Sequence, residues 1–275
     1  MVMRQGSLSS AARALNISQP TARRQIEALE EELGVPLFTR APSGLLPTDY
    51  GTGLLAQAEA AEAAIGAFRR GASGAVDEER GTVRIACSEV YGVEIMPNLL
   101  SHLIRDYPQL ETELVLSNRS EDLLRREADI AVRLTEPTQD ALVARKVKPV
   151  GFGFYATREF LKTYPAPKTY GEFVERGRFI SDDRRDFMRK GFQAAKLKLP
   201  KTIVFRTDSD LAQLAAIRAG LGIGICQNRF AAPSNLVRVL PEVSVKLECW
   251  IVMHEDLRHM RRVKLVFDYL VKALG

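Results

Sequence analysis

A cluster of polar side chains that can bond nucleic-acid bases follows Ser18. Its members are Gln19, Thr21, Arg23, Arg24 and Gln25. Arginine can bond guanine through two hydrogen bonds, glutamine can do so with adenine, and both also bond phosphate oxygens. On the exposed end of a helix, such side chains are suited to reading DNA. The residues that we expect to contact DNA are Ser18, Gln19, Pro20, Thr21, Arg23, Arg24, Gln25 and Arg40.

The segment around this cluster predicts a helix with defined ends. Ser18 is a good N-cap, because its hydroxyl can accept a hydrogen bond from a backbone N–H of the first turn. Pro20 stands in that turn, where its missing N–H costs little, and Gly34 supplies the C-terminal stop. Apolar residues recur at intervals of four, three and four positions, which predicts one buried stripe. These residues are Ala22, Ile26, Leu29 and Leu33.

A shorter helix is predicted just before this one, capped by Ser7. Its inward residues would be Leu8, Ala11, Ala12 and Leu15. Asn16 and Ile17 then form a tight turn into the next helix. Small alanines let two helices cross closely, as a helix-turn-helix requires, and in that motif the second helix enters the major groove. The alternative is an ordinary helical hairpin in a core.

A second set of polar residues follows predicted strands. In open α/β sheets, ligands gather at the carboxyl ends of strands, where loop amides and helix N-termini converge. The candidate small-molecule contacts at these ends are Ser88, Ser117, Asn118, Arg133 and Asp208. Arg133 can pair with a carboxylate, since a guanidinium binds this group through two hydrogen bonds. The alternative is ordinary capping for the serines and a solvated edge charge for Arg133.

From residue 82 onward the sequence alternates between strand and helix patterns. The strands expected first are 82–87, 113–116 and 128–134, with helices at 95–107 and 120–126. This rhythm predicts a parallel sheet with helices on both faces. The second such unit has strands at 179–180, 203–205 and 223–225, a helix at 209–219, and then a strand at 250–253 and a helix at 261–274.

A long helix without proline is predicted over residues 49–70. Its apolar residues recur at four, three, four and three positions, an a/d seam suited to a coiled coil between two chains. The dimerisation residues expected here are Leu54, Ala58, Ala61, Ile65 and Phe68. The alternative is a helix packed on its own chain, because only about two heptads are visible. The glycines of residues 71–74 break the helix, and we expect a hinge there.

These motifs together resemble those of the LysR-type transcriptional regulators, over nearly the whole chain. The matching residues are Gly6–Leu8, Ala11–Ala12, Leu15, Ser18–Pro20, Arg24–Ile26, Leu29–Glu30, Leu33–Gly34, Leu37–Phe38, Arg40, Thr48 and Gly51. The resemblance implies an N-terminal all-α winged helix-turn-helix, a long linker helix for dimerisation, and an α/β effector domain. That domain would have two lobes, built like a periplasmic solute-binding protein. The domains expected are 1–50, 51–81 and 82–275, with the first lobe at 82–150 and 255–275 and the second at 151–254.

The sequence departs from the family pattern in three places. The family has a full helix before Gly6, of which residues 1–5 are present here, so the resemblance predicts a truncated first helix and a poorly packed small domain. Arg23 stands where the family usually has a small hydroxyl residue, so either base preference differs or a phosphate contact replaces a base contact. The expected wing, residues 40–48, has few basic side chains, which leaves Arg40 as its clearest phosphate contact.

The resemblance implies a cytoplasmic, sequence-specific DNA-binding transcriptional regulator. The expected partners are double-stranded DNA, a small-molecule effector between the lobes, further copies of the chain in a dimer or tetramer, and RNA polymerase. Arg133 favours an effector with an anionic group. One alternative is a two-lobed small-molecule binding module whose incomplete helix-turn-helix does not bind DNA. The other is an enzyme of the same fold, but no nucleophile, base and orienting group occur together, so no catalytic residue is expected.

Charge and cysteine content narrow the function classes. The net charge is +5, yet residues 1–80 carry eight arginines, no lysine and ten acidic residues, a local net charge of −2. DNA binding must therefore depend on the local placement of arginines and on the avidity of a dimer or tetramer. Three cysteines without CxxC spacing indicate reduced thiols. His102, His254 and His259 show no metal-ligand spacing, so neither a metal nor a cofactor is expected.

Two further patterns exclude other classes. No run of about 18 apolar residues is present, so no membrane span is expected, and the N-terminus lacks the apolar core of a secretion signal. Gly220–Gly224 superficially resembles a nucleotide-binding loop. It follows a predicted helix and precedes a strand, the reverse of the nucleotide fingerprint, so we interpret it as a helix end and a strand entry.

Overall fold

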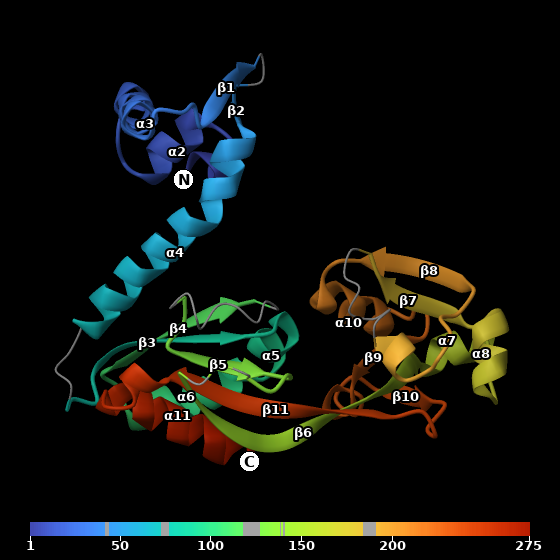
Figure 1. Cartoon of the computed structure of the whole chain (residues 1–275). Coiled ribbons are helices and arrows are strands. Elements are labelled where there is room, and N and C mark those ends of the chain that lie inside the picture. Colours follow the sequence, from blue (N-terminus) through green and yellow to red (C-terminus); the bar gives the residue numbers. More distant parts are fainter. Residues whose placement is uncertain (42–43, 73–76, 118–126, 138, 140, 184–190) are drawn as a thin grey trace. The chain divides into compact units, whose positions relative to one another are not determined.

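In the computed structural model the chain divides into two compact units, residues 1–66 and 67–275, each described separately (Figure 1). The structure describes residues 1–41, 44–72, 77–117, 127–137, 139, 141–183 and 191–275. The expected helix at 120–126 therefore lies outside the described residues. Within them, no helix has the length and apolar character needed to cross a bilayer.

The first unit is a helix-turn-helix followed by a β-hairpin and the start of a long helix. Its elements are α1 (Val2–Gln5), α2 (Leu8–Ala14), α3 (Gln19–Leu33), β1 (Phe38–Ala41), β2 (Gly44–Pro47) and α4 (Asp49–Gly71). The predicted helix ends are confirmed, because the Ser18 hydroxyl accepts from the Thr21 N–H at 3.2 Å and Gly34 is left-handed with φ 70°. The turn before α3 passes through Asn16, whose φ is 54°.

The buried stripe predicted along α3 is confirmed only at its start. Ala22 is buried, as are Ala11 and Ala12 of α2, and Ile26 is half-buried. Leu29 and Leu33, by contrast, are 45% and 42% exposed, and Leu15 of the preceding turn is 46% exposed. The reason is length: α3 extends about 22 Å and α2 only about 10 Å, so the second half of α3 runs past its neighbour.

The base of the hairpin is fixed to α3 and to α4 by side chains that bond backbone groups. The Glu30 carboxylate accepts from the N–H groups of Leu37 and Phe38 at 2.6 and 2.9 Å. The Thr48 hydroxyl donates to the Pro36 carbonyl at 2.9 Å and accepts from the Gly51 N–H at 3.0 Å. These bonds set where β1 begins relative to the reading helix.

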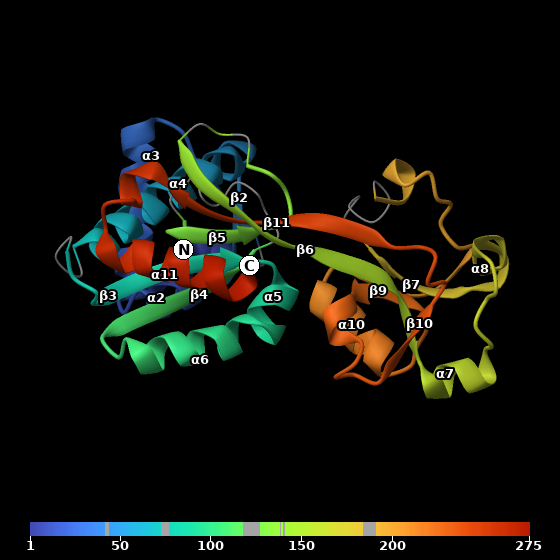
Figure 2. The ribbon, with the colours of Figure 1, turned by 90° about the horizontal axis from the view of Figure 1, so that it is seen from below.

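The second unit contains two lobes that share one mixed sheet. Its first-lobe strands are β3 (Gly81–Cys87), β4 (Leu110–Leu116) and β5 (Ile130–Arg133), and its two long strands are β6 (Leu142–Thr157) and β11 (Val245–His254). The strand order is β10-β6-β11-β5-β3-β4, and β9 also pairs with β6. β3 is parallel to β4 and β5, as predicted, whereas β11 pairs antiparallel with both β5 and β6. The long strands cross from one lobe to the other (Figure 2).

The first lobe packs three helices against this sheet. They are α5 (Glu89–Glu94), α6 (Met96–Asp106) and α11 (Arg261–Leu274). Val263, Val266 and Leu270 of α11 join Val83 and Ile85 of β3 in one core, which confirms that the last helix returns to the first lobe. The expected second lobe, 151–254, also needs correction, because Trp250–Met253 pair with β5. These four residues belong to the first lobe's sheet, since the return strand begins in one lobe and ends in the other.

The second lobe is built on the far half of β6. Its helices are α7 (Arg158–Thr163), α8 (Tyr170–Arg176) and α10 (Asp210–Arg218), and its strands are β7 (Arg178–Asp182), β8 (Thr202–Thr207), β9 (Gly224–Gln227) and β10 (Leu236–Val239). β7 and β8 are parallel, while β9 and β10 pair antiparallel with β6. Phe154, Phe173 and Phe179 meet edge to face in its core. Gly220 ends α10 with φ 74° and Gly224 begins β9, as the glycine pattern predicted.

An ion pair joins the two lobes. Both guanidinium Nη atoms of Arg218 on α10 donate to the two oxygens of Glu94 at the end of α5, at 2.6 and 2.7 Å, and Arg218 Nε donates to Ser234 at 2.9 Å. This bidentate hydrogen bonding holds the pKa of Glu94 below its ordinary value of 4.5 and raises the pKa of Arg218. The pair therefore resists separation of the lobes while Glu94 is ionised.

Gly51→Ala is expected to destabilise the first unit. A Cβ at residue 51 would lie 2.3 Å from the Leu37 carbonyl oxygen, a backbone atom, so the base of the hairpin must shift. We expect a loss of about 1–3 kcal/mol in calorimetric unfolding of the first unit. Gly53→Ala is the matched control, because a Cβ there meets nothing within 4 Å and alanine favours the helix by about 1 kcal/mol. Equal melting temperatures of the Gly51→Ala variant and the native chain would contradict the close approach of residue 51 to the Leu37 carbonyl.

Glu94→Gln is expected to lower the stability of the second unit at neutral pH. The partly exposed pair contributes up to about 1 kcal/mol. Because the pKa of Glu94 is lowered by folding, this contribution is present above its ordinary value of 4.5 and is lost as pH falls further. Calorimetry should thus show a difference at pH 7 that shrinks below pH 4.5. Glu159→Gln, which removes an exposed pair with Lys162, should show no difference at either pH.

Candidate functional site

The polar cluster at the start of α3 forms one exposed edge of the first unit. Gln19, Arg23, Arg24 and Gln25 are all exposed, and Thr21 is half-buried. Ser18 and Thr21 are joined by a 2.7 Å bond between their hydroxyls, in addition to the capping bond. Their side chains thus order the first turn, while the glutamines and arginines remain available to a ligand.

The two arginines of this edge differ in their surroundings. The Arg23 Nε donates to Glu27, one turn further along α3, at 2.8 Å. Both side chains are about half exposed, and such pairs stabilise a helix by only about 0.3–0.5 kcal/mol, so a phosphate can replace the carboxylate. Arg24 forms no ion pair within the described part of the chain. On the hairpin, Arg40 is exposed in β1, opposite Leu45 of β2.

The residues expected to form a dimer seam lie along α4. Leu54 is half-buried, whereas Ala58, Ala61, Ile65 and Phe68 are exposed in the single chain. Ile65 and Phe68 leave 57% and 77% of their side chains open to water. Exposed large apolar side chains at coiled-coil spacing are what a helix that pairs with another helix requires.

Three of the predicted effector residues meet at the carboxyl ends of β3, β4 and β5. The Arg133 Nη1 donates to the Ser117 carbonyl at 3.0 Å, and the Ser117 N–H donates to the Cys87 carbonyl at 2.9 Å. Ser88 follows Cys87 directly and occupies the N-cap position of α5 without making a side-chain capping bond. The capping role considered for Ser88 is thus absent. Asn118 lies outside the described residues.

The second lobe reaches this region through α10. Ser209 caps α10 by accepting from the Ala212 N–H at 3.4 Å, and its hydroxyl also donates to Glu89 of α5 at 3.0 Å. The predicted residue Asp208 is its exposed neighbour. Neither Glu89 nor Ser209 is among the effector contacts predicted from the sequence, although each directly follows one of them. Their relation depends on the packing of two segments 120 positions apart.

Three buried polar atoms near the crossing strands lack a hydrogen-bond partner in the described part of the chain. They are Gln227 Oε1, Arg238 Nε and Trp250 Nε1. Trp250 pairs with both Arg133 and Lys146 across the sheet, so these three side chains share one face. The Lys146 ammonium lies 5.8 Å from the Trp250 ring centroid. Unsatisfied buried donors and acceptors are costly.

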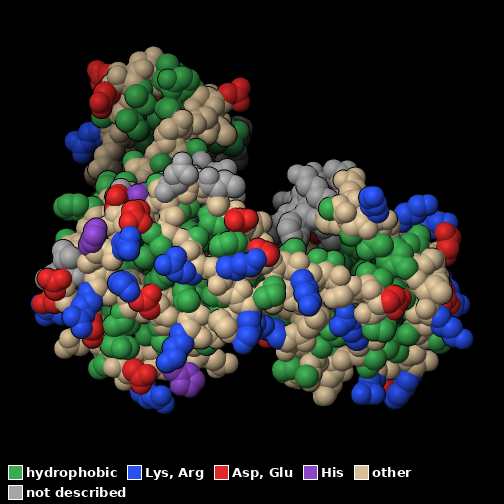
Figure 3. Space-filling model, turned by 60° about the horizontal axis from the view of Figure 1, so that its bottom comes forward, with side chains coloured by type: hydrophobic (Ala, Val, Ile, Leu, Met, Phe, Trp, Pro, Cys, Tyr) green, Lys and Arg blue, Asp and Glu red, His purple; other side chains and the backbone are tan. Residues whose placement is uncertain are grey.

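Basic and acidic side chains both lie in this region, where Lys146 pairs with Glu248 and Glu89 begins α5. Arg133 and Lys146 share the sheet face, and Arg229 lies over the Tyr91 ring at 5.6 Å. Figure 3 shows Lys and Arg side chains spread over both lobes on the face that it presents, with Asp and Glu among them. Among these groups, the Arg133 guanidinium is the one suited to pair with a small anion.

The cysteines are placed for packing. Cys87, Cys226 and Cys249 are all buried, and burial raises the pKa of Cys87 and of Cys226 to about 12. Thiols of this kind are mostly protonated near neutral pH and therefore unreactive. Among the residues that the structure describes, no group of three His, Cys, Asp or Glu side chains could hold a metal ion.

Comparison with known proteins agrees with this architecture. Residues 1–52 match the model of the bacterial regulatory helix-turn-helix proteins of the lysR family, and residues 77–275 match the LysR substrate binding domain. A probable HTH-type transcriptional regulator of Klebsiella pneumoniae, LtrA, is 24% identical over 287 residues, covering 99% of this chain and 92% of LtrA.

Two full-length structures show the same fold. The Vibrio cholerae virulence activator AphB has a TM-score of 0.64 at 21% identity, with 100% of this chain and 96% of AphB covered. CbnR in complex with its target DNA has a TM-score of 0.66 at 20% identity and the same coverage. With one family model matched by the first unit's helix-turn-helix and another by most of the second unit, this chain belongs to the LysR family of bacterial regulatory helix-turn-helix proteins.

Proposed function

We propose that this protein binds specific DNA sites through α3 and that a small anionic effector, bound between the lobes of the second unit, controls this binding. The observation that carries the proposal is the capped N-terminal edge of α3, where Gln19, Arg23, Arg24 and Gln25 are exposed together. In a helix-turn-helix this edge meets the base pairs of the major groove. A structural neighbour, CbnR, is solved with its target DNA, which supports the same use of the fold here.

In this proposal, dimerisation supplies the DNA affinity that the net charge of a single first unit cannot provide. Ser18 and Thr21 order the start of α3, and Arg24 and Arg40 are the exposed groups best suited to bind bases and phosphates. Because the N-terminal region has a negative net charge, one copy would bind weakly. Pairing of α4 helices through Ile65 and Phe68 would present two reading helices to half-sites about one helical turn apart. A dimer of dimers would add further avidity.

The effector is a small molecule with a carboxylate or a similar anionic group. Arg133 can bind it through the guanidinium, and the Ser88 hydroxyl can add a hydrogen bond. Ser117, Asp208 and, in the part of the chain outside the described residues, Asn118 are the remaining predicted contacts. AphB is named an activator, and RNA polymerase becomes a further partner if this chain also activates transcription.

Arg24→Ala is expected to weaken specific DNA binding. We would measure fluorescence anisotropy on DNA from upstream of the gene itself, across a salt series. The loss of one base contact that is made through two hydrogen bonds should cost about 1–3 kcal/mol of binding free energy, or about 5- to 150-fold in affinity. Arg80→Ala is the control, because it removes the same charge from an exposed residue that pairs with Glu78. If the native chain binds neither this DNA nor a genomic library while forming folded dimers, the binding-module alternative replaces the regulator proposal.

Arg133→Ala is expected to abolish the response to the effector. Small carboxylic acids would be screened for an increase in the melting temperature of the full chain, because a ligand that binds the native state stabilises it. The acid with the largest shift on the native chain should give little shift on the Arg133→Ala variant. Arg145→Ala, an exposed arginine in β6, is the control. An equal shift in both variants would place the effector elsewhere.

A further inference from the structure

The last turn of α4 is attached to the first lobe by a buried ion pair. Arg70 Nε lies 3.1 and 3.3 Å from the two carboxylate oxygens of Asp129, and its Nη2 lies 3.2 Å from one of them. The two side chains are only 11% and 7% exposed. Removing one partner of such a pair leaves a buried charge uncompensated, so the pair strongly favours one arrangement of α4.

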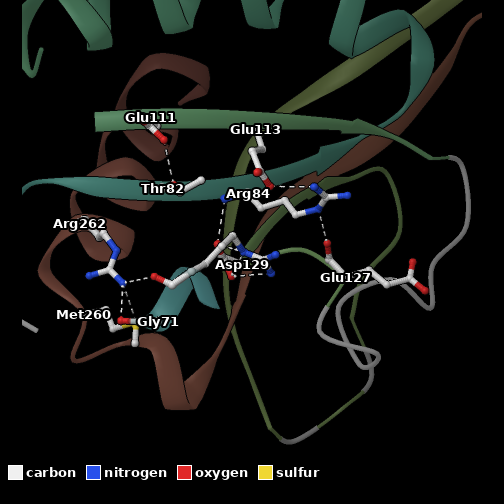
Figure 4. A network of polar contacts seen from close by, with 10 residues as sticks. Gly71, Thr82, Arg84, Glu111, Glu113, Glu127, Asp129, Met260 and Arg262 are labelled. Atoms are coloured by element: carbon white, nitrogen blue, oxygen red, sulfur yellow. Dashed lines mark hydrogen bonds and ion pairs between the residues drawn. The ribbon is translucent and has the colours of Figure 1, made fainter. Parts of the chain in front are cut away.

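A second arginine bonds the carbonyl groups at the C-terminal end of the same helix. Arg262 of α11 is 1% exposed, and its Nη2 donates to the carbonyls of Arg70 and Gly71 at 2.8 and 3.1 Å (Figure 4). The last carbonyls of a helix have no partner within it and carry the negative end of its dipole. Arg262 satisfies two of them from a segment 191 positions away.

The ion pair is also joined to two strands of the first lobe's sheet. One Asp129 oxygen accepts from the Arg84 N–H at 2.8 Å, and the Asp129 N–H donates to the Arg84 carbonyl at 2.8 Å. The Arg84 guanidinium in turn donates to the Glu127 carbonyl and to Glu113 of β4, each at 2.7 Å. Figure 4 shows Asp129 beside Arg84, whose guanidinium points toward Glu113 and Glu127.

The same two strands lead to the candidate effector site. Asp129 immediately precedes β5, and Arg133 is the last residue of that strand. Arg84 lies in β3, and Ser88 is the residue directly after the end of that strand. Each interval is four residues, or about 13 Å of extended chain. The residues inside these two intervals are fully buried, namely Ile85, Ala86, Ile130 and Ala131. Close-packed protein interiors of this kind transmit strain.

We propose that Arg70, Asp129 and Arg262 form a clamp that makes the last turn of α4 part of the first lobe, and that β3 and β5 couple this clamp to ligand binding at Arg133 and Ser88. The proposal rests on the effector site of the proposed function. Of the expected hinge at residues 71–74, Gly71 is held by Arg262, and residues 73 and 74 lie outside the described residues.

The clamp itself can be tested by hydrogen exchange of the full chain, followed by mass spectrometry. In Asp129→Asn and in Arg262→Met, the amides of residues 68–72 should exchange at least about tenfold faster than in the native chain. Arg261→Met is the matched control. Arg261 is the neighbour of Arg262, but its own guanidinium pairs with Glu79 at 2.7 Å instead of the carbonyls at the end of α4. Arg262→Lys should give an intermediate rate. Unchanged exchange in the core strand β11 would show that each variant is folded, and native rates at 68–72 in both clamp variants would overturn the clamp.

The coupling needs a second readout that a purely structural role would not change. Arg133→Ala alters the effector end of β5 and should change exchange at residues 68–72 by about threefold or more. The same substitution in the Asp129→Asn background should add nothing further, because the path is already interrupted. No effect of Arg133→Ala at 68–72, or an equal effect in both backgrounds, would overturn the coupling. DNA-binding anisotropy, measured on the same proteins, keeps the two tests separate. A lack of DNA binding would contradict the proposed function, whereas only the exchange rates test whether the clamp exists.

Discussion

Two antiparallel strands, β6 and β11, are the constraint on which the second unit depends. Each contributes to both lobes, so the seven-stranded sheet runs through both of them, whereas the β7–β8 pair forms a separate small sheet in the second lobe. The strands β3 and β5 are held in place by β11, and β9 and β10 by β6. Their carboxyl ends and the start of α10 therefore face a common region. Ligand-binding geometry follows from this shared sheet more than from any single loop.

The first unit has a different constraint, which is the attachment of the hairpin to the reading helix. Glu30 projects from α3 to two backbone N–H groups of the chain entering β1. Gly51 lets α4 approach the Leu37 carbonyl, where any side chain would collide. The hairpin, α3 and the start of α4 are thereby fixed relative to one another. An arginine on the hairpin can then be placed against a phosphate at the same time as α3 meets the bases.

The sequence predicted the features that depend on local chemistry. Ser18 and Gly34 were identified as helix ends because capping and positive φ leave a signature at single positions. The strands of the first lobe were found for a similar reason, since their apolar runs are continuous. The sequence could not show that Arg218 meets Glu94 or that Arg262 bonds the Gly71 carbonyl, because polar contacts between residues far apart in the chain leave no periodic pattern. It also overstated burial of Leu29 and Leu33, since periodicity shows which face is apolar but not whether a neighbour is long enough to cover it.

Control by a ligand requires two arrangements whose free energies are close and a ligand that binds one of them better. The lobes meet through two polar, partly exposed pairs, Ser209–Glu89 and Glu94–Arg218, and through Val90 and Ile95, which pack against a core of the second lobe. Both carboxylates lie on α5, which follows directly from β3. A ligand beside Ser88 would therefore act where β3 passes into the helix that carries the lobe contacts. Because the opposite part of β3 holds Arg84 against Asp129, this strand connects α5 with the carboxylate that binds Arg70 at the end of α4.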